Sequence, residues 1–291
     1  MVFEVLRNGV VAPARRWPNG IVYYRISDEF EQFHKDAILT AMKCLEDVSC
    51  VRFYEAKRNV KNYVNIIPSE IGTCSAMLGY RGGEQRLQLA KERPKCFNPI
   101  IVAHELLHTL GFFHEHMASD RDDFITINWE NIRPGREIFY MKLDNKTATD
   151  FGYGYDYESI LHYGPMSFSD NGLPTITALD SNANIGQRDH LSPKDIGKLN
   201  AMYNCPLKVE ENENQESGQT EDGGGPAEES EEGEDESQET ETDEGEDEDE
   251  SENKTDGDDV VESEESINET DGVVKVELAK KKYIPSEINE I

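Results

Sequence analysis

The sequence predicts an α+β domain in its first 205 residues, followed by an acidic segment that forms no core. Three observations predict this. Helix signatures with start or stop signals occur at three places. Short runs of β-branched and aromatic residues accompany the first two of them. The acidic residues, finally, are concentrated after residue 205. A chain of 291 residues is long enough for one good-sized domain and a further segment.

Charge separates the two parts of the chain. From Pro206 onward there are 34 Asp and Glu residues against six Lys, so residues 206–291 carry −28 of the total charge of −31. Their only aromatic residue is Tyr283. Such a composition buries too little apolar surface to offset the entropy of ordering, and we predict that it is disordered. No basic region suggests nucleic-acid binding, and no apolar run is long enough to span a membrane.

The first half of the domain contains short strands and one long helix. Pro18-Asn19-Gly20 is a turn signal, and a strand is predicted after it at 21–26. A helix follows, for which Asp28 and Glu31 form a possible capping box. Its apolar residues recur at helical spacing: Phe30, Phe33, Ile38, Met42 and Leu45. Further strands are predicted at 51–54, 64–67 and 87–89, with a turn at 81–83.

Two later helices are marked by their ends. Asn98 is a good N-cap, Pro99 suits the first helical position and Gly111 suits the C-terminal cap, so a helix is predicted over 99–110. A long stretch poor in periodic signals follows. The last helix starts at Ser192-Pro193-Lys194-Asp195 and is predicted to end near residue 203.

The stretch HELLHTLGFFHEH, residues 104–116, carries the chemistry. On a helix, His104 and His108 are one turn apart on the same face, so both rings can reach one Zn²⁺. Glu105 can then take a proton from a metal-bound water without itself binding the metal. Gly111 can adopt a left-handed conformation and turn the chain back, so that His114 supplies a third ligand. Three protein ligands leave a position open, as in catalytic zinc sites.

The alternative is a helix that is rich in histidine by chance. HExxH fixes only three positions and also occurs in helices without a metal. HExxHxxGxxH fixes five, including a glycine with a mechanical reason to be there, and this longer pattern favours a metal site.

These residues resemble the zinc signature of the astacin family of metalloendopeptidases, within the metzincins, in which a Glu follows the third His, as Glu115 does here. The resemblance covers most of residues 14–205. It includes RRWPNGIVYYRI, SCVRF, YVNII, GYRGGEQRLQL, DRDDFITINWENI, YDYESILHYG and IGQRDHLSPKDIGKLNAMYNC, in that order. It implies a domain of two subdomains flanking an active-site cleft, with the first subdomain ending at about Gly111.

The resemblance also implies roles. The three histidines would bind one Zn²⁺ per chain, and Glu105 would be the general base and then the acid that protonates the leaving amine. Tyr163, in SILHYG, would bind zinc at rest and then hydrogen-bond the oxyanion. Outside this motif, a tyrosine there would more often be a packed core residue. The substrates would be proteins or peptides.

Two departures from the family pattern concern the surroundings of the site. The methionine of the family's Met-turn falls at Leu161, which keeps an apolar side chain of similar volume, so we expect activity to survive. In the family, Glu115 pairs with the N-terminus freed when a propeptide is removed. We interpret residues 1–13 as a propeptide remnant or the mature N-terminal segment, with cleavage expected after Arg7 or nearby.

Five cysteines lie in the domain, and none forms a CxxC pair. The resemblance implies the disulfides Cys50–Cys205 and Cys74–Cys96. That leaves Cys44, which we expect to be a buried free thiol or, alternatively, to form an intermolecular bridge.

An oxidising, secretory environment is indicated by these cysteines and by glycosylation sequons at Asn145, Asn253 and Asn268. No signal peptide is recognisable in the chain as given. Either the chain as given is incomplete at its N-terminus or the protein is not secreted; we favour the first, and expect a secreted glycoprotein.

Arg188, in IGQRDH, is the candidate for recognising acidic substrate residues just after the cut; a surface ion pair with Asp189 or another neighbour is the competing interpretation. The acidic segment could bind Ca²⁺ or a basic partner weakly and in a salt-sensitive manner. Two alternatives to a protease follow: a catalytically silent binding protein with this fold, which Leu161 favours, and an acidic calcium- or matrix-binding protein. Salt-dependent calcium binding by the acidic segment would support the latter.

Overall fold

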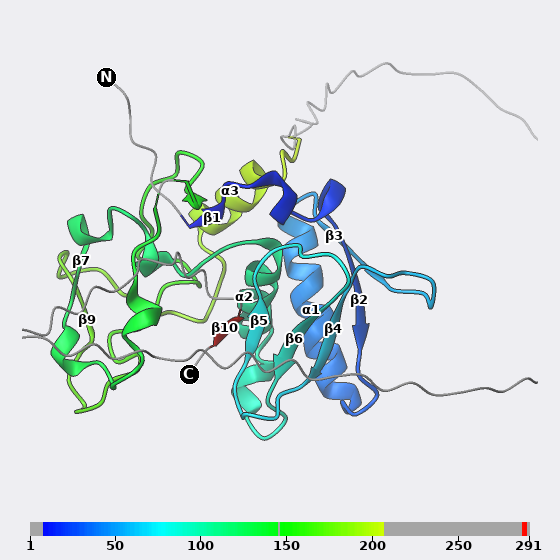
Figure 1. Cartoon of the computed structure of the whole chain (residues 1–291), viewed down its shortest axis with the longest axis horizontal. Coiled ribbons are helices and arrows are strands. Elements are labelled where there is room, and N and C mark those ends of the chain that lie inside the picture. Colours follow the sequence, from blue (N-terminus) through cyan, green and yellow to red (C-terminus); the bar gives the residue numbers. More distant parts are fainter. Residues whose placement is uncertain (1–7, 145, 207–286, 290–291) are drawn as a thin grey trace, which may run out of the picture. The chain divides into compact units, whose positions relative to one another are not determined.

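The computed structural model describes residues 8–144, 146–206 and 287–289. The predictions for residues 1–7, for the sequons at Asn145, Asn253 and Asn268, and for nearly all of the acidic segment lie outside the described residues. Residues 8–111 form a first region with regular strands and helices, and residues 112–206 form a second region with few of them (Figure 1).

A six-stranded sheet organises the first region. Its strand order is β10-β5-β6-β4-β2-β3. The strands are β2 (Ile21–Ile26), β3 (Arg52–Glu55), β4 (Tyr63–Pro68), β5 (Ser75–Met77), β6 (Glu84–Leu89) and β10 (Glu287–Asn289). β3, β2, β4 and β6 are parallel neighbours, whereas β5 runs antiparallel to β6 and β10 antiparallel to β5.

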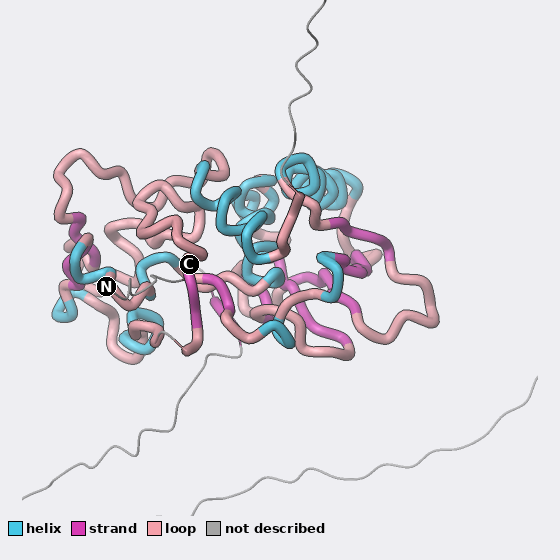
Figure 2. Tube along the Cα trace, turned by 90° about the horizontal axis from the view of Figure 1, so that it is seen from above, coloured by secondary structure: helices cyan, strands magenta, loops and turns pink. Residues whose placement is uncertain are grey.

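Two helices, α1 (Gln32–Val48) and α2 (Pro99–Leu110), contact each other and lie over the same side of this sheet (Figure 2). The predicted start of α1 was wrong by one turn. Its N-cap is Glu31, which forms a capping box with His34, while Asp28 lies in a turn before the helix. Phe33 also departs from the predicted apolar stripe, because it is 59% exposed.

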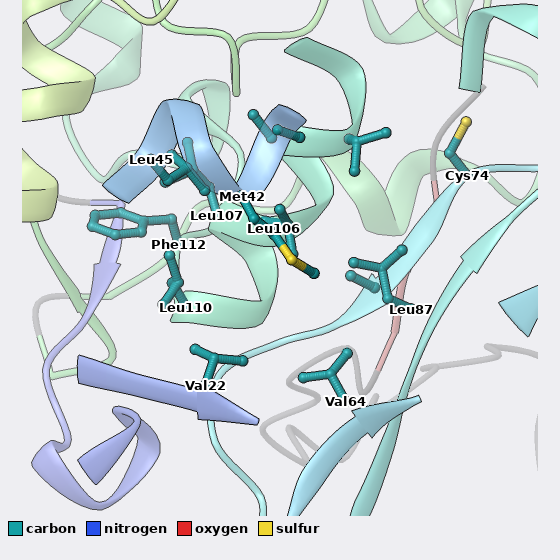
Figure 3. Packing of buried hydrophobic residues seen from close by; sticks show 14 of the residues in the cluster. Val22, Met42, Leu45, Val64, Cys74, Leu87, Leu106, Leu107, Leu110 and Phe112 are labelled. Carbon is teal, nitrogen blue, oxygen red and sulfur yellow. The ribbon is translucent and has the colours of Figure 1, made fainter. Parts of the chain in front are cut away.

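The main core lies between the helices and the sheet (Figure 3). Aliphatic residues dominate it, and those shown together in Figure 3 include Val22, Met42, Leu45, Val64, Leu87, Leu106, Leu107 and Leu110. α2 is buried almost all round, since every residue from Val102 to Leu110 is inaccessible to solvent. A helix buried on all sides is held rigidly, and here it is the helix that carries the HExxH residues.

The second region consists mainly of loops and short 3-10 turns (Figure 2). Its strands are β7 (Ile125–Ile127), β8 (Ala148–Thr149) and β9 (Ile176–Ala178), and its one α-helix among the described residues is α3 (Pro193–Met202). β7 pairs with β9, while β8 pairs with β1 (Gly9–Val10). The 3-10 turns of the two regions are Pro13–Arg15, Pro18–Gly20, Pro94–Phe97, Glu115–Met117, Arg121–Asp123, Trp129–Asn131 and Glu137–Tyr140. A second, smaller core in this region contains three tyrosines, Tyr140, Tyr155 and Tyr163.

The structure contains the disulfides Cys50–Cys205 and Cys74–Cys96, the same two pairs that the resemblance implied. The first joins the start of β3 to the residues after α3, and so ties the two regions together. Cys44 is a free thiol, but it is half-buried rather than buried, because it lies on the outer side of α1 beside Leu39 and Thr40.

The predicted α+β class is confirmed, and so are α2 and the start of α3, including both N-caps. The strands at 21–26, 51–54, 64–67 and 87–89 are present, with ends shifted by up to three residues. Among the described residues, six strands were not predicted: β1, β5, β7, β8, β9, and β10 within the segment expected to be disordered. Over the residues that the structure describes, no helix is long and apolar enough to cross a membrane.

Candidate metal centre

Helix α2 positions the first residues of the candidate site. The Asn98 side chain accepts a hydrogen bond from the backbone N–H of Ile100, and Pro99 occupies the first helical position. These two features fix where the helix begins. His104, Glu105 and His108 consequently lie on its last two turns, fully buried.

Gly111 ends the helix and redirects the chain. It has φ +111° and ψ 21°, and its N–H bonds the carbonyls of Leu107 and His108. A Cβ at this position would lie 2.8 Å from a methyl group of Val10. Both the backbone conformation and the close approach of Val10 therefore favour glycine, and the turn brings His114 back to α2.

Three histidine Nε2 atoms converge at one point. The Nε2 atom of His108 is 2.9 Å from that of His104 and 3.2 Å from that of His114. Ligand atoms of the three rings lie within 4.8 Å of one another, and all three residues are buried. Nitrogen ligands at about 2.0–2.1 Å from a tetrahedral zinc would be about 3.3 Å apart, so this spacing fits one zinc ion.

The opposite ring nitrogens show which atoms carry the lone pairs. The Nδ1 of His104 is 2.5 Å from the carbonyl oxygen of Ile160, and the Nδ1 of His108 is 2.6 Å from that of Phe112. A carbonyl oxygen only accepts, so each Nδ1 carries a hydrogen, and the neutral tautomer with this arrangement has its lone pair on Nε2, facing the cluster. Lone pairs facing each other repel unless a cation lies between them, and such second-sphere carbonyls are typical of metal-binding histidines.

The turn Ser159–Tyr163 supports this arrangement from the second region. Its Ile160 carbonyl accepts from His104, and its Leu161 carbonyl accepts from the backbone N–H of Glu115 at 3.0 Å. Asp195, at the start of α3, in turn accepts from the Ser159 hydroxyl at 2.6 Å and from the Ile160 N–H at 3.0 Å. The buried Leu161 side chain belongs to the main core.

Tyr163 lies against the third histidine. Its ring centroid is 4.4 Å from that of His114, and the ring stacks on His116 at 4.0 Å. The tyrosine is both a member of the second core and part of the wall of a cavity. Core packing, the competing interpretation from the sequence, is thus present, and the same side chain also lies beside the histidines.

Glu115 is buried and paired, but with a residue that the sequence did not suggest. Both of its carboxylate oxygens are 2.8 Å from the Lys198 ammonium, and Oε1 also accepts from the backbone N–H of Asp156. Burial raises the pKa of Glu115 to about 7, although Lys198 opposes the rise. Asn8, where an N-terminus would lie after cleavage at Arg7, is itself buried, and its carbonyl accepts from the N–H of Phe113.

A cavity of about 710 Å³ adjoins the histidine cluster through Tyr163. Arg188 lines it and donates from Nη1 to the carbonyls of His162 and Gln187. Arg93 and Lys95 line it too, against one acidic residue, Glu92. Cationic side chains therefore outnumber anionic ones around this cavity.

Several buried polar residues around the site had no signal in the sequence. Besides Asp195 and Lys198, they include His162, which is fully buried between the Tyr155 hydroxyl and the Tyr163 carbonyl. Burial lowers the pKa of His162 to about 4, so it is neutral at pH 7. Asp195 and Lys198 bond residues far away in the sequence, Ser159 and Glu115, so only the fold brings these pairs together, whereas the partners of His162 are nearby in the chain.

A buried cluster of three histidine nitrogens that fits one metal ion, a carboxylate on the same helix and an adjoining cavity define a metal-dependent hydrolase on an α+β domain. A family model described as Astacin (Peptidase family M12A) matches residues 9–204. The chain therefore belongs to the astacin family.

Relatives and a solved structure agree with this assignment. The chain is 44% identical over 209 residues to seminal metalloprotease 1 of Drosophila melanogaster, covering 70% of this chain and 83% of the fly protein. It is 40% identical over 203 residues to zinc metalloproteinase nas-14 of Caenorhabditis elegans, covering 70% of this chain but only 40% of that one. The solved structure of high choriolytic enzyme 1 from the medaka Oryzias latipes, a hatching-enzyme zinc protease, superposes with a TM-score of 0.60 at 35% identity, over 66% of this chain and 94% of the fish chain. The protein is accordingly a zinc metallopeptidase that acts on protein substrates.

Proposed function

We propose that the protein is an endopeptidase in which His104, His108 and His114 hold one zinc ion and Glu105 moves the protons. The observation that carries the proposal is the convergence of three Nε2 atoms, two of them on rings whose Nδ1 bonds a backbone carbonyl. A zinc ion held there supplies a Lewis acid, which polarises the scissile carbonyl and makes an attacking water more acidic.

Glu105 follows His104 directly on α2 and lies in the same buried environment. We assign it the general-base step, removal of a proton from the attacking water, and then delivery of that proton to the leaving amine. Its position on a helix buried on all sides supports this, because a carboxylate fixed by packing does not need to be ordered at the moment of reaction.

Tyr163 would act on the side of the reacting carbonyl opposite Glu105. Its ring is held between His114 and His116, at the wall of the cavity. From there we propose that its hydroxyl donates a hydrogen bond to the developing oxyanion, the kind of preorganised donor that typically contributes most to acyl-transfer catalysis.

Gly111, Leu161 and Glu115 are assigned positioning roles. Gly111 supplies the turn that returns His114, Leu161 anchors the turn Ser159–Tyr163 in the main core, and Glu115 fixes the chain after His114 by pairing with Lys198. Because leucine fills the place of the family methionine with an apolar side chain of similar volume, the substitution leaves catalysis intact in this proposal.

Arg188 is proposed to favour acidic substrate residues just after the cut. The cationic lining of the adjoining cavity supports this, since Arg93 and Lys95 add to the same potential. An Arg188→Gln variant should lose preference for Asp or Glu over Ala at that position, measured as the ratio of kcat/KM values for matched peptides, while cleaving the Ala peptide as before.

We further propose that the protein is secreted and activated by cleavage near Arg7. The two disulfides favour an oxidising compartment. A new N-terminus at Asn8 would lie beside Phe113, the neighbour of His114, so removal of residues 1–7 would act on the site directly. Glycosylation at the sequons belongs to the same proposal, and mass spectrometry of the secreted protein tests all three features.

For the acidic segment we propose weak, multivalent binding of Ca²⁺ or of a basic partner, which is supported by its 34 acidic residues against six lysines. Binding of this kind should weaken as salt rises. Calorimetric titration of calcium into the full chain and into a chain ending at Val209, at two salt concentrations, tests it.

The central experiment measures zinc content and casein cleavage for the chain beginning at Asn8, with Glu105→Ala and, as matched control, the exposed Glu70→Ala. We expect about one zinc per chain in all three proteins. Glu105→Ala should lose a factor of about 10² or more in activity, and Glu70→Ala should lose none. Zinc bound without cleavage by any of the three would contradict the protease and favour the silent binding protein.

A further inference from the structure

Strand β10 comes from the far end of the chain and completes the sheet of the first region. Glu287, Ile288 and Asn289 pair antiparallel with Met77, Ala76 and Ser75 of β5. β10 thus belongs to the same compact unit as the metallopeptidase domain. Of the sheet strands within residues 8–206, β5 is the outermost on this side, so its outer backbone groups form an edge that β10 covers (Figure 1).

The edge that β10 covers lies beside the candidate site. β5 contacts α2, the helix that carries His104 and His108. Two residues after β5, the backbone N–H of Gly79 donates to the carbonyl of His108 at 2.9 Å. One residue before β5, Cys74 lines the cavity that Tyr163 and Arg188 also line. A chain paired with β5 therefore spans from the histidine helix to this cavity.

We infer that the C-terminal segment Glu287–Asn289 is an intramolecular occupant of the β5 edge and competes there with protein substrates. The inference rests on the proposed endopeptidase function. An extended chain that adds to a sheet edge gains main-chain hydrogen bonds whatever its sequence, so one edge accepts both a substrate and a segment of the enzyme itself. The residue pattern of β10, with one apolar residue between two polar ones, suits a strand at an edge.

Competition for one edge has a defined kinetic signature. A substrate must displace β10 before it pairs with β5, which raises the apparent KM and leaves kcat unchanged. Because β10 belongs to the same chain, the effect does not depend on enzyme concentration. Both features distinguish this device from a loss of catalytic residues, which lowers kcat.

The test compares three forms of the chain beginning at Asn8: the full chain, a chain lacking residues 282–291, and the full chain with Glu287→Pro and Ile288→Pro. Alternate residues of an antiparallel strand direct their N–H groups to the same neighbour, so two consecutive prolines remove at least one donor that faces β5. Glu262→Pro with Ser263→Pro is the matched control. We expect the shortened chain and the β10 proline variant to have a KM about 3- to 10-fold lower than the full chain and the control, at equal kcat.

A synthetic peptide of residues 282–291 gives a second measurement that needs no cleavage. Fluorescence polarisation should show the labelled peptide binding to the zinc-loaded shortened chain carrying Glu105→Ala and not to the corresponding full-length variant. Equal KM values together with no difference in peptide binding would overturn the inference and leave the endopeptidase standing. A KM difference that grows with enzyme concentration would indicate pairing between two chains and would overturn it as well. If none of the forms cleaves, the endopeptidase proposal fails, and peptide binding alone decides whether β10 covers this edge.

Discussion

The two regions of the domain bury different kinds of residue. In the first, α1, α2 and the sheet enclose a core made mainly of aliphatic side chains. In the second, the core contains three tyrosines, and buried polar or charged residues such as Arg121, Asp156, His162, Asp195 and Lys198 lie around it. The candidate metal centre forms where the two meet, with two histidines on α2 and the third in the chain that follows Gly111.

The difference follows from how each region satisfies its backbone. Helices and strands pair their own N–H and C=O groups, so the side chains between them can all be apolar. An irregular chain pairs its backbone groups only in scattered turns and single contacts, and buried side chains bond some of the remaining groups. Arg121 donates to the His116 carbonyl, Asn131 donates to the Pro174 carbonyl, and Asp195 accepts from the Ile160 N–H. In the second region, polar side chains therefore do what secondary structure does in the first.

The largest difference in the loss of stability is expected between substitutions of two lysines, Lys198 and Lys43. Lys198→Met removes the partner of the buried Glu115 and should lower the free energy of unfolding by about 3–5 kcal/mol, because the buried carboxyl group is left without its ion-pair partner. Lys43→Met breaks an exposed i,i+4 pair with Asp47 on α1 and should change it by only about 0.3–0.5 kcal/mol. Urea denaturation measures both.

The Lys198→Met/Glu115→Gln double variant provides the check. Glutamine keeps an oxygen for the Asp156 N–H and carries no charge, so it should recover much of the loss. If the double variant were no more stable than Lys198→Met alone, the loss would come from packing rather than from the unpaired carboxylate.

The two disulfides should contribute differently to stability, because one joins the two regions and the other lies within the first region. Replacing Cys50 and Cys205 by Ser frees a loop of 155 residues, whereas replacing Cys74 and Cys96 frees 22. Each change should lower the free energy of unfolding by about 2–5 kcal/mol, and the chain-entropy model makes the long loop more costly by about 2 kcal/mol. Denaturation without reductant gives the difference, and equal losses would contradict the entropic account.

Asp195 tests whether the polar network of the second region reaches the metal centre. Asp195→Asn loses an acceptor for Ser159, Ile160 or Ser192 and should lower the free energy of unfolding by about 1–3 kcal/mol. Because Ile160 bonds His104, zinc affinity should also fall, by about 10- to 100-fold. Competition with a chelator measures the affinity. Asp36→Asn, an exposed change on α1, should alter neither quantity, and unchanged zinc affinity in Asp195→Asn would separate the network from the site.

The sequence predicted the parts of this site that are encoded locally. The N-cap Asn98, the C-terminal Gly111 and the i,i+4 histidines all lie within one short stretch, and spacing alone places them on one helix. The family resemblance extended this to Tyr163 and to the disulfides. Its proposed roles for the site residues remain predictions until the variants are measured.

The parts that were missed depend on distant residues. Lys198 is 83 positions from Glu115, and Asp195 is 35 positions from Ile160, so no local pattern connects them. Strand β5 has only three residues, too few for an alternation of apolar and polar residues to show. The start of α1 was misplaced because the inner partner of the capping box is His34 rather than Glu31. In each case the local sequence was compatible with more than one structure, and tertiary contacts determined which one formed.

A small, pH-dependent effect on stability is expected in the first region, at an exposed carboxylate. The hydrogen bond from the Tyr63 hydroxyl, and after it that from Asn65, hold the pKa of Glu84 below its ordinary value. A carboxyl group with a lowered folded-state pKa adds stability above its unfolded pKa, and this stability is lost as the pH falls through the folded value. Tyr63→Phe should therefore lower the free energy of unfolding at pH 7 by less than about 1 kcal/mol, since water screens the exposed Glu84, and the difference should shrink towards pH 3.

The matched variant in the second region is Tyr140→Phe. The Tyr140 hydroxyl is buried and bonds two neutral partners, the Ser167 carbonyl and the Thr175 hydroxyl. Its loss should lower the free energy of unfolding by about 1–3 kcal/mol, because buried acceptors lose their donor, and by the same amount at each pH. Urea denaturation at pH 7, 5 and 3 separates the two variants. Phenylalanine keeps the ring that packs on Arg25, so Tyr63→Phe removes only the hydroxyl. A loss of stability that did not depend on pH would mean that this hydroxyl contributes through its contacts rather than through the charge of Glu84.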